Sequence, residues 1–288
     1  MIRVNENLYN ILRLIEDEDS GIQTVIYQEL RKNSLELILN KEEYRSKLDK
    51  KQNEKLDILL NNIHLDIVHE AFFTLMSRTA EDIDLENSML ILSYWNNNKI
   101  NCQSIKAKLK DIESGITMPK TGHPLAFIDH ISEHLRNEFI VSKDDENPDN
   151  YYLNRLLEKK QGFPLTLTIL YIIISNRIGI PVFGVPIYQY FMLKFLNEED
   201  EIFFDPFYSG KKYSRKMLEN YINEYTNSFK PEELNLDGCS NIDIVILFLR
   251  NLSIAYTQYS YNPDNIKQIE IFNEILTNHH ANASLNRD

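Results

Sequence analysis

Apolar side chains are almost continuous along one segment of the chain, Leu165–Ile178. The polar interruptions are few, namely Thr166, Thr168, Ser175, Asn176 and Arg177. A helix that is apolar on every face lies inside a core, so this pattern predicts a buried central helix. Pro164 suits the first turn of this helix, because that turn lacks N–H partners. Gly179 suits a left-handed C-terminal cap, and Pro181 prevents the helix from continuing.

Three short runs of β-branched and aromatic residues follow this helix, at Val182–Val185, Tyr190–Leu196 and Glu201–Phe204. Side chains alternate along these runs with period 2, and turn-like segments separate them, which is typical of antiparallel strands. The predicted centre of the fold is therefore a buried helix followed by a short antiparallel sheet. Since helical patterns dominate the rest of the chain, the expected fold class is α+β, mostly α.

Helical spacing of apolar residues recurs through residues 1–118. Examples are Leu8–Ile15, Ile22–Leu30, Leu56–Met76 and Asp84–Trp95, where apolar positions repeat every three or four residues. The charged segment Lys41–Lys55 is expected to be an exposed helix or the approach to one. Glycine and proline cluster in Gly115–Gly122, which marks the clearest boundary in the chain. The sequence thus predicts a helical N-terminal region that ends there.

Two further helices are expected near the C-terminus, at Ile242–Tyr259 and Asn265–Leu276. The first resembles the opening helix of a tetratricopeptide-like hairpin, and a single hairpin has to pack on other parts of the chain. We therefore expect three regions. They are a helical N-terminal region over 1–118, a core over 119–232 and a C-terminal helical hairpin over 233–288.

Composition narrows the classes of partner. The net charge of −12 over 288 residues argues against nucleic acid, whose binding depends on neutralising phosphates. No apolar run reaches the roughly 18 residues of a membrane span. The N-terminal sequence lacks the shape of a signal peptide, and the two cysteines, Cys102 and Cys239, fit a reducing compartment. We expect a cytoplasmic protein with no nucleic-acid or membrane partner.

Five motifs stand in a fixed order in the middle of the chain: Asn147–Asn150 (NPDN), Tyr152–Glu158 (YLNRLLE), Gly162–Leu167 (GFPLTL), Gly179–Val185 (GIPVFGV) and Asp205–Phe207 (DPF). This ordered set resembles the SirB1 family, whose members carry a transglutaminase-like domain of the papain-like type. The resemblance is strong over Asn147–Ile222 and weaker over most of the remaining chain. It implies a papain/transglutaminase-like core flanked by helical regions.

The resemblance also bears on activity. An active site of this type has a Cys at the N-terminus of the buried helix, where the helix dipole favours thiolate. A His on the following strands acts as base, and an Asp or Asn orients it. The resemblance puts Pro164 in the place of the Cys and Tyr190 in the place of the His, and only Asp205 is retained. Since proline has no nucleophile and tyrosine has a pKa near ~10, we expect a non-catalytic protein that acts through a protein partner.

A second interpretation is a hydrolase or acyltransferase that uses other residues of the same cleft, with Thr166, Tyr190 and Asp205 as candidates. The polar residues of the YLNRLLE motif would then line the rim, and the candidates are Tyr152, Asn154, Arg155 and Glu158. Arg155 could bind a carboxylate with two hydrogen bonds. The structural interpretation of the same residues is that they tie the loop Ser142–Asn150 to the following helix, because buried polar side chains usually satisfy backbone groups.

One metal-like motif is present. His130–His134 matches HxxEH, which would place two histidines on one face of a helix. A zinc site needs a third ligand, and the sequence offers none at an identifiable place. We therefore expect no metal and no cofactor.

Overall fold

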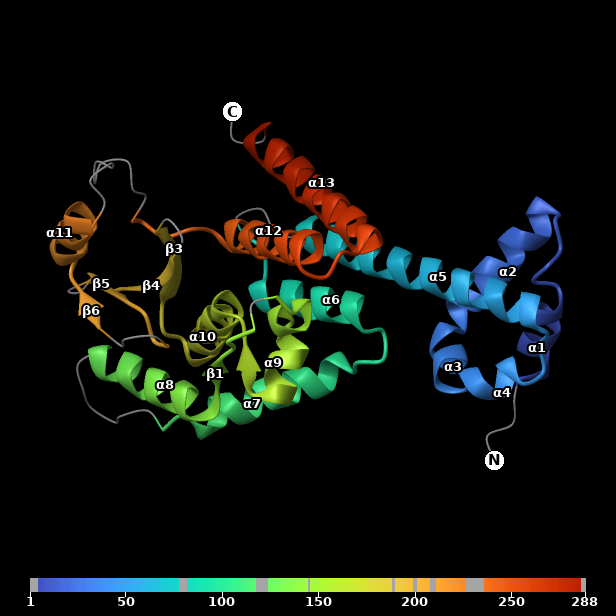
Figure 1. Cartoon of the computed structure of the whole chain (residues 1–288), viewed down its shortest axis with the longest axis horizontal. Helices are drawn as coiled ribbons and strands as arrows, with labels where there is room; N and C mark the ends of the chain where they lie inside the picture. The colour runs from blue at the N-terminus through green and yellow to red at the C-terminus, as the bar shows by residue number, and fades with distance from the viewer. Residues whose placement is uncertain are drawn as a thin grey trace. The chain divides into compact units, whose positions relative to one another are not determined.

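The computed structural model describes residues 5–77, 82–117, 124–144, 146–187, 190–198, 201–207, 211–225 and 236–285. The chain forms two compact units. Unit 1 consists of Met1–Ala71 with Asn97–Lys99, and unit 2 consists of Phe72–Asn96 with Ile100–Asp288. Figure 1 shows the elements of both units, coloured from the N-terminus to the C-terminus.

Unit 1 is built from short helices around the first part of a long one. Its elements are α1 Glu6–Arg13, α2 Ser20–Lys32, α3 Ser34–Leu39, α4 Lys41–Arg45 and the beginning of α5 Lys50–Ser77. The side chains of Asn5 and Asp19 cap α1 and α2 by accepting hydrogen bonds from the first backbone N–H groups. Apolar stripes on these helices meet in one core, with Leu12, Leu30 and Tyr44 fully buried.

The centre of unit 2 is α10, Pro164–Ile178, and every residue from Leu165 to Ser175 is buried. Phe163 is the N-cap and Pro164 the first helical residue. Gly179 ends the helix in the left-handed conformation, with a φ of 81°, where glycine carries no steric cost. The buried central helix that the apolar pattern predicts is therefore present, with the expected start and end.

A four-stranded antiparallel sheet follows α10. Its strands are β3 Val182–Ile187, β4 Tyr190–Leu196, β5 Glu201–Phe204 and β6 Lys212–Tyr213, in the order β3-β4-β5-β6. One face of the sheet contacts α10, where the rings of Phe204 and Tyr171 lie 5.5 Å apart edge to face. The other face packs on α11, Arg215–Tyr225, through Val185, Phe203 and Leu218. The prediction of an α+β fold, mostly α, with a short antiparallel sheet is confirmed.

Further helices surround α10 within unit 2: α6 Leu85–Asn96, α7 Cys102–Gly115, α8 Pro124–Glu138 and α9 Leu153–Lys159. Two very short strands, β1 Ile140–Val141 and β2 Gln161–Gly162, pair in parallel on either side of a 3-10 turn, η1 Pro148–Tyr151. At the end of α10, Arg177 binds Glu86 with two hydrogen bonds of 2.6 and 2.7 Å. The same guanidinium binds Glu113 at 3.1 Å, so one cation joins α6, α7 and α10.

The C-terminal hairpin consists of α12 Asn241–Gln258 and α13 Pro263–Leu285. It packs on the rest of unit 2 through aromatic rings. Phe272 contacts Phe72 and Trp95, with ring centroids 5.0 and 5.2 Å apart. Phe248 lies edge to face with Tyr152. The hairpin therefore buries its apolar face against other helices, as a single hairpin must.

The predicted boundaries at 118/119 and 232/233 lie outside the described residues and stay predictions, as does the tetratricopeptide-like character of the hairpin. Across the described ranges, no helix has the length and apolar character needed to cross a membrane.

Candidate functional site

The N-terminus of α10 is the place where a transglutaminase-like nucleophile is expected. The residues just before it are fixed by several contacts. The backbone N–H of Phe163 donates to the carbonyl of Asn150 at 2.8 Å. The Phe163 ring stacks on Tyr151 with centroids 4.2 Å apart. At Gly162 an added Cβ would lie 2.9 Å from the side chain of the buried Leu156, so that side chain would have to shift to make room for it. These contacts fix where the first turn of α10 begins.

The side chains of that first turn offer no reactive group. Pro164 is the first helical residue and has neither a heteroatom in its side chain nor a backbone N–H. The Thr166 hydroxyl is fully buried and donates to the carbonyl of Tyr151 at 2.9 Å. Its proton is thus committed to a backbone acceptor and not to a base.

Asp205 follows β5 directly and is half-buried. Its Oδ1 atom accepts a hydrogen bond from the backbone N–H of Phe207 at 2.9 Å, which is the geometry of an Asx turn. Tyr190 begins β4 and pairs with Ile187, but its side chain lies outside the part of the chain that the structure describes. The expected contact between Tyr190 and Asp205 therefore stays a prediction.

Tyr152 and Asn154 are buried side chains of the YLNRLLE motif. The Tyr152 hydroxyl lies 2.9 Å from the hydroxyl of Tyr256 on α12, and burial raises the pKa of Tyr152 well above its usual range. The backbone N–H of Asn154 donates to the Ser93 hydroxyl at 3.4 Å. Neither polar atom of the Asn154 side chain has a hydrogen-bond partner among the described residues. The structure places Tyr152 against the C-terminal hairpin, whereas sequence reasoning grouped it with the cleft.

Arg155 and Glu158 lie on the surface of α9. The Arg155 guanidinium donates to Glu158 at 3.2 Å and lies 3.5 Å from the carboxylate of Asp149 in η1. The adjacent loop has its own hydrogen bonds, since the Asn150 amide donates to the Ser142 hydroxyl at 3.1 Å and to the Asp144 carbonyl at 2.7 Å. Arg155 thus ties the loop to the helix, which agrees with the structural interpretation of this motif.

Hydrogen bonds within the loop join residues that no sequence motif connects. Ser142 accepts a hydrogen bond from Gln161 at 3.0 Å, and its backbone N–H donates to the carbonyl of Gly162 at 2.8 Å. The NPDN motif draws attention to Asn150, but nothing in the sequence pairs that residue with Ser142. This network holds the segment before α10 in place, and it is a supporting structure and not a reactive one.

The HxxEH motif lies on α8. His130 is exposed, and the Nε2 atom of the half-buried His134 lies 3.5 Å from the carboxylate of Glu138. In the ranges that the structure covers, no group of three His, Cys, Asp or Glu side chains is arranged to hold a metal ion.

Both cysteines are free. Cys239 is half-buried, and its backbone N–H donates to the carbonyl of Gly184 at 2.8 Å. Burial raises the pKa of the Cys239 thiol to about 12 and also raises that of Cys102. Because the thiolate is the reactive form of cysteine, neither side chain is set up as a nucleophile.

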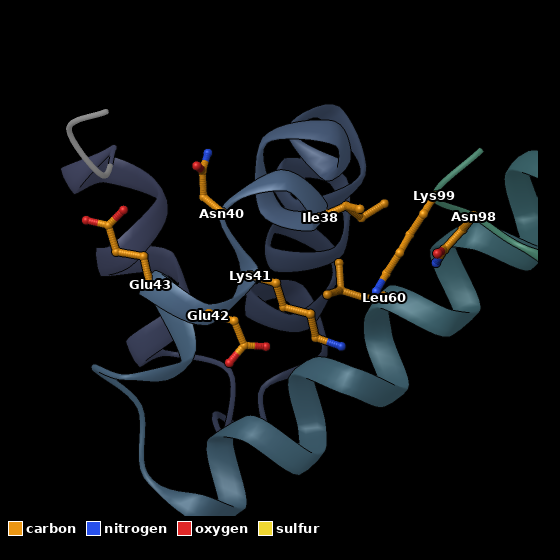
Figure 2. A pocket seen from close by; sticks show the side chains of 8 residues that line it. All are labelled: Ile38, Asn40, Lys41, Glu42, Glu43, Leu60, Asn98 and Lys99. Atoms are coloured by element: carbon orange, nitrogen blue, oxygen red, sulfur yellow. The ribbon is translucent and has the colours of Figure 1, made fainter. Parts of the chain in front are cut away.

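Unit 1 contains a separate hollow of about 390 Å³, shown in Figure 2. Its lining residues are Ile38, Asn40, Lys41, Glu42, Glu43, Leu60, Asn98 and Lys99. Lys99 extends toward Leu60 in this view, and Glu43 points away from both. Lys41 forms an ion pair with Asp57 at 2.7 Å. Charges of both signs line this hollow, as they do on ordinary solvated surface.

A model of the transglutaminase-like superfamily matches residues 102–250, just over half of the chain. The chain belongs to the transglutaminase-like superfamily. The matched segment contains α10, the four-stranded sheet and the positions of Pro164, Tyr190 and Asp205. The transglutaminase-like core inferred from the five motifs is therefore confirmed, at the level of the superfamily.

Individual relatives cover less of the chain. A UPF0162 protein from Xylella fastidiosa (strain 9a5c) is 27% identical over 114 residues, which is 38% of this chain and 41% of that protein. F-box only protein 21 from Mus musculus is 26% identical over 93 residues, which is 30% of this chain and 15% of that protein. The chain thus spans about two fifths of the length of the UPF0162 protein that it matches, and a smaller share of the F-box protein.

One solved structure is similar in outline. It is a crystal structure of menin, described as revealing the binding site for Mixed Lineage Leukemia (MLL) protein. The match has a TM-score of 0.42 and 7% identity, and it covers 75% of this chain and 62% of menin. A similarity of this size carries no argument about the function of this protein.

Proposed function

We propose that this protein is a non-catalytic, SirB1-type member of the transglutaminase-like superfamily that works in the cytoplasm as a regulatory or protein-interaction module. The observation that carries the proposal is Pro164, the first residue of the buried helix α10. Covalent acyl transfer begins with attack by a side-chain heteroatom, and proline has none. Its missing backbone N–H also removes one donor that could stabilise an oxyanion.

The surrounding groups support the same proposal. Thr166 is the nearest hydroxyl in α10, and its hydrogen bond to the Tyr151 carbonyl leaves it without a base. Asp205 accepts a hydrogen bond from the Phe207 backbone in its own turn. The two thiols have raised pKa values, so they favour the unreactive protonated form. A nucleophile paired with a base is the minimum for this chemistry, and these groups do not supply one.

The helical parts outside the core support an interaction role. Unit 1 is built from α1–α4 and the beginning of α5, and α12 with the following turn exposes Ile246, Ile254 and Tyr261. Partner proteins are often recognised through apolar and aromatic side chains on helical surfaces. We propose a protein partner and no nucleic-acid partner, because the net charge is −12.

The alternative function is a hydrolase or acyltransferase that uses non-standard residues of the cleft, and the retained Asp205 is the observation that favours it. The test uses the full chain with a fluorogenic peptide amide, and compares wild type with Asp205→Ala. We expect no turnover above buffer from either protein. Turnover by wild type that disappears in Asp205→Ala, with an unchanged circular dichroism spectrum, would overturn the non-catalytic proposal. A Cys102→Ser, Cys239→Ser double variant is the control for adventitious thiol reactions.

A further inference from the structure

A groove runs between α2 and α5 in unit 1, far along the sequence from the start of α10. It has a volume of about 610 Å³ and is lined by Ile15, Ser20, Gln23, Thr24, Ile26, Tyr27, Lys55, Ile58 and Leu59. The α2 residues lie at spacings of three, four and seven, and the α5 residues at three and four, so each helix contributes one face. The groove therefore follows α2 for about two turns and α5 for about one turn.

The inner surface of this groove is mainly apolar. Ile15 and Ile26 are buried at its base, whereas Ile58 on the α5 wall is 61% exposed. The polar atoms on the α2 side already have local partners. The Gln23 amide donates to the carbonyl of Asp17 at 2.9 Å, and the Thr24 hydroxyl donates to the carbonyl of Ser20 at 2.8 Å. What remains available in the groove is apolar surface of the kind that marks binding sites.

The groove also contains one charged side chain, that of Lys55. Of the described lining residues, Lys55 alone carries a formal charge at neutral pH. Lys55 is half-buried, and no hydrogen bond or ion pair joins it to another residue in the described ranges. The charged groups around it are already paired. Lys51, one turn before Lys55, binds Glu16 at 2.8 Å, and at the other end of the groove Asp66 accepts a hydrogen bond from Tyr27.

We propose that the groove binds an amphipathic helix of a partner protein, with a carboxylate on that helix paired to Lys55. The α2 wall extends from Ser20 to Tyr27, about 10 Å at the rise of an α-helix, and the α5 wall from Lys55 to Leu59, about 6 Å, so the groove has room for one to two turns of a third helix. Apolar residues at spacings of three, four and seven on the partner would cover Ile15, Leu59 and Ile58. The carboxylate follows from charge complementarity, since a half-buried lysine without a partner favours an anion.

A helix fits this groove better than a fatty acid does. Small-molecule sites enclose most of the ligand surface, whereas this groove is partly open to solvent and leaves Ile58 largely exposed. A long-chain carboxylate bound here would keep much of its tail in water. This inference rests on the part of the proposed function that expects a protein partner, and it does not depend on the chemistry at α10.

The experiment selects binders of the full chain from a display library of 16-residue helical peptides, and measures selected peptides by fluorescence anisotropy. We expect the enriched sequences to share an apolar stripe with at least one Asp or Glu at its edge. Ile58→Glu should weaken binding by at least about tenfold, because it puts a charge in the centre of the apolar contact. Val25→Glu is the matched control, since Val25 is 57% exposed on α2 and does not line the groove, and it should leave affinity within about twofold.

A charge reversal tests the role of Lys55. Lys55→Glu should weaken the binding of an acidic peptide by about fivefold. The same peptide with its acidic residue changed to Lys should bind the Lys55→Glu variant with the lost affinity restored. The proposal is overturned if no helical peptide is enriched, if peptides bind wild type and Ile58→Glu equally, or if the charge reversal restores nothing. It is also overturned if sodium dodecanoate occupies the groove and peptides do not. These outcomes are independent of amide turnover. If peptides do not bind in the groove, the proposal that the protein is non-catalytic is unaffected.

Discussion

Single residues decide the chemistry at the start of α10. Pro164 fits the first helical position well, because its fixed φ matches the helix and its missing N–H would have had no partner there. The same substitution leaves the site without a nucleophile. The fold is therefore compatible with proline at the point where catalysis would require a thiol. Mutation of Pro164 can separate what the helix start needs from what catalysis needs.

Restoring the missing groups should give a reactive thiol but no enzyme. In Pro164→Cys with Tyr190→His, a thiol at a helix N-terminus gains a lowered pKa from the dipole. We expect iodoacetamide to label it faster than Cys102 or Cys239, whose pKa values burial raises. The measurement is the labelling rate by mass spectrometry at pH 7, with wild type as control. Turnover of the fluorogenic amide by this variant would show that the cleft still binds a substrate, against our expectation.

A cluster of charges beside the sheet should make stability depend on pH. Glu201 accepts two hydrogen bonds from Arg215, both 2.8 Å, and lies 2.8 Å from the Lys194 ammonium. Hydrogen bonding from Arg215, and then from Lys194, lowers the pKa of Glu201 from 4.5 to about 2. Because the folded-state pKa is lowered, the stabilisation is complete above pH 4.5 and is lost as the pH falls toward about 2.

Glu201→Gln should therefore lower the free energy of unfolding by about 2 kcal/mol at pH 7, since it leaves Lys194 buried without its counter-charge. Urea denaturation should show this difference from wild type shrinking between pH 4.5 and pH 2.5. Glu198→Gln, at an exposed position between β4 and β5, is the control and should have no such effect. An equal difference at both pH values would mean that the charge of Glu201 is not what stabilises the fold.

At the scale of elements, the sequence predicts well those segments whose pattern is long and unmixed. The apolar run from Leu165 determines α10, because burial on every face leaves a single consistent structure. Shorter elements were not predictable. The strands β1 and β2 have two residues each, and their parallel pairing brings Ile140 next to Gln161, a contact between distant residues that local spacing cannot encode.

The charged segment after Asn40 shows a second limit of prediction from sequence patterns. The sequence predicts an exposed helix or the approach to one there, and the structure has a five-residue helix, α4, and the beginning of α5. Tyr44 in α4 is fully buried, donates to Glu36 at 2.7 Å and accepts from the backbone N–H of Asn5 at 3.2 Å. One aromatic side chain among charges carries no period, so only its tertiary partners reveal that it belongs to the core.

The candidate site was predictable to a similar degree. The motif order placed Pro164 at the start of the helix and Asp205 after the third strand, and both positions are found there. The partner of Tyr152 could not be foreseen, because Tyr256 lies 104 residues further along the chain. Composition and spacing identify the elements that carry a site, whereas the contacts that orient its side chains depend on the folded chain.

The central helix provides the clearest stability prediction at this scale. Leu170 is fully buried in α10, so Leu170→Ala should lower the free energy of unfolding by about 2–5 kcal/mol through lost contacts and a cavity. Thermal and urea denaturation measure the change. Leu196→Ala, at a leucine that is 42% exposed at the end of β4, is the control and should cost far less. An unchanged melting temperature for Leu170→Ala would contradict the assignment of α10 as the centre of the core.

At the scale of the whole molecule, residues from distant parts of the sequence meet in one aromatic cluster of unit 2. The cluster consists of Phe72, Trp95, Tyr152, Phe248 and Phe272. It joins the end of α5, α6, the turn before α9 and both helices of the C-terminal hairpin. The hairpin is therefore part of the core of unit 2, and its removal should affect the helices that carry the transglutaminase-like site.

The only tryptophan of the chain makes this arrangement measurable. Trp95 lies 5.2 Å from Phe272 and 6.2 Å from Tyr152, measured between ring centroids, and is almost fully buried. Phe272→Ala removes a fully buried ring, so it should cost about 3–5 kcal/mol in the free energy of unfolding. It should also shift Trp95 emission to longer wavelength, because water reaches the indole when the ring is lost.

The control is Phe73→Ala, since Phe73 is 60% exposed on α5, and it should leave both readings near wild type. If Phe272→Ala leaves Trp95 emission unchanged in the folded protein, α13 does not pack on α6 in solution, and the hairpin is not held in the core of unit 2.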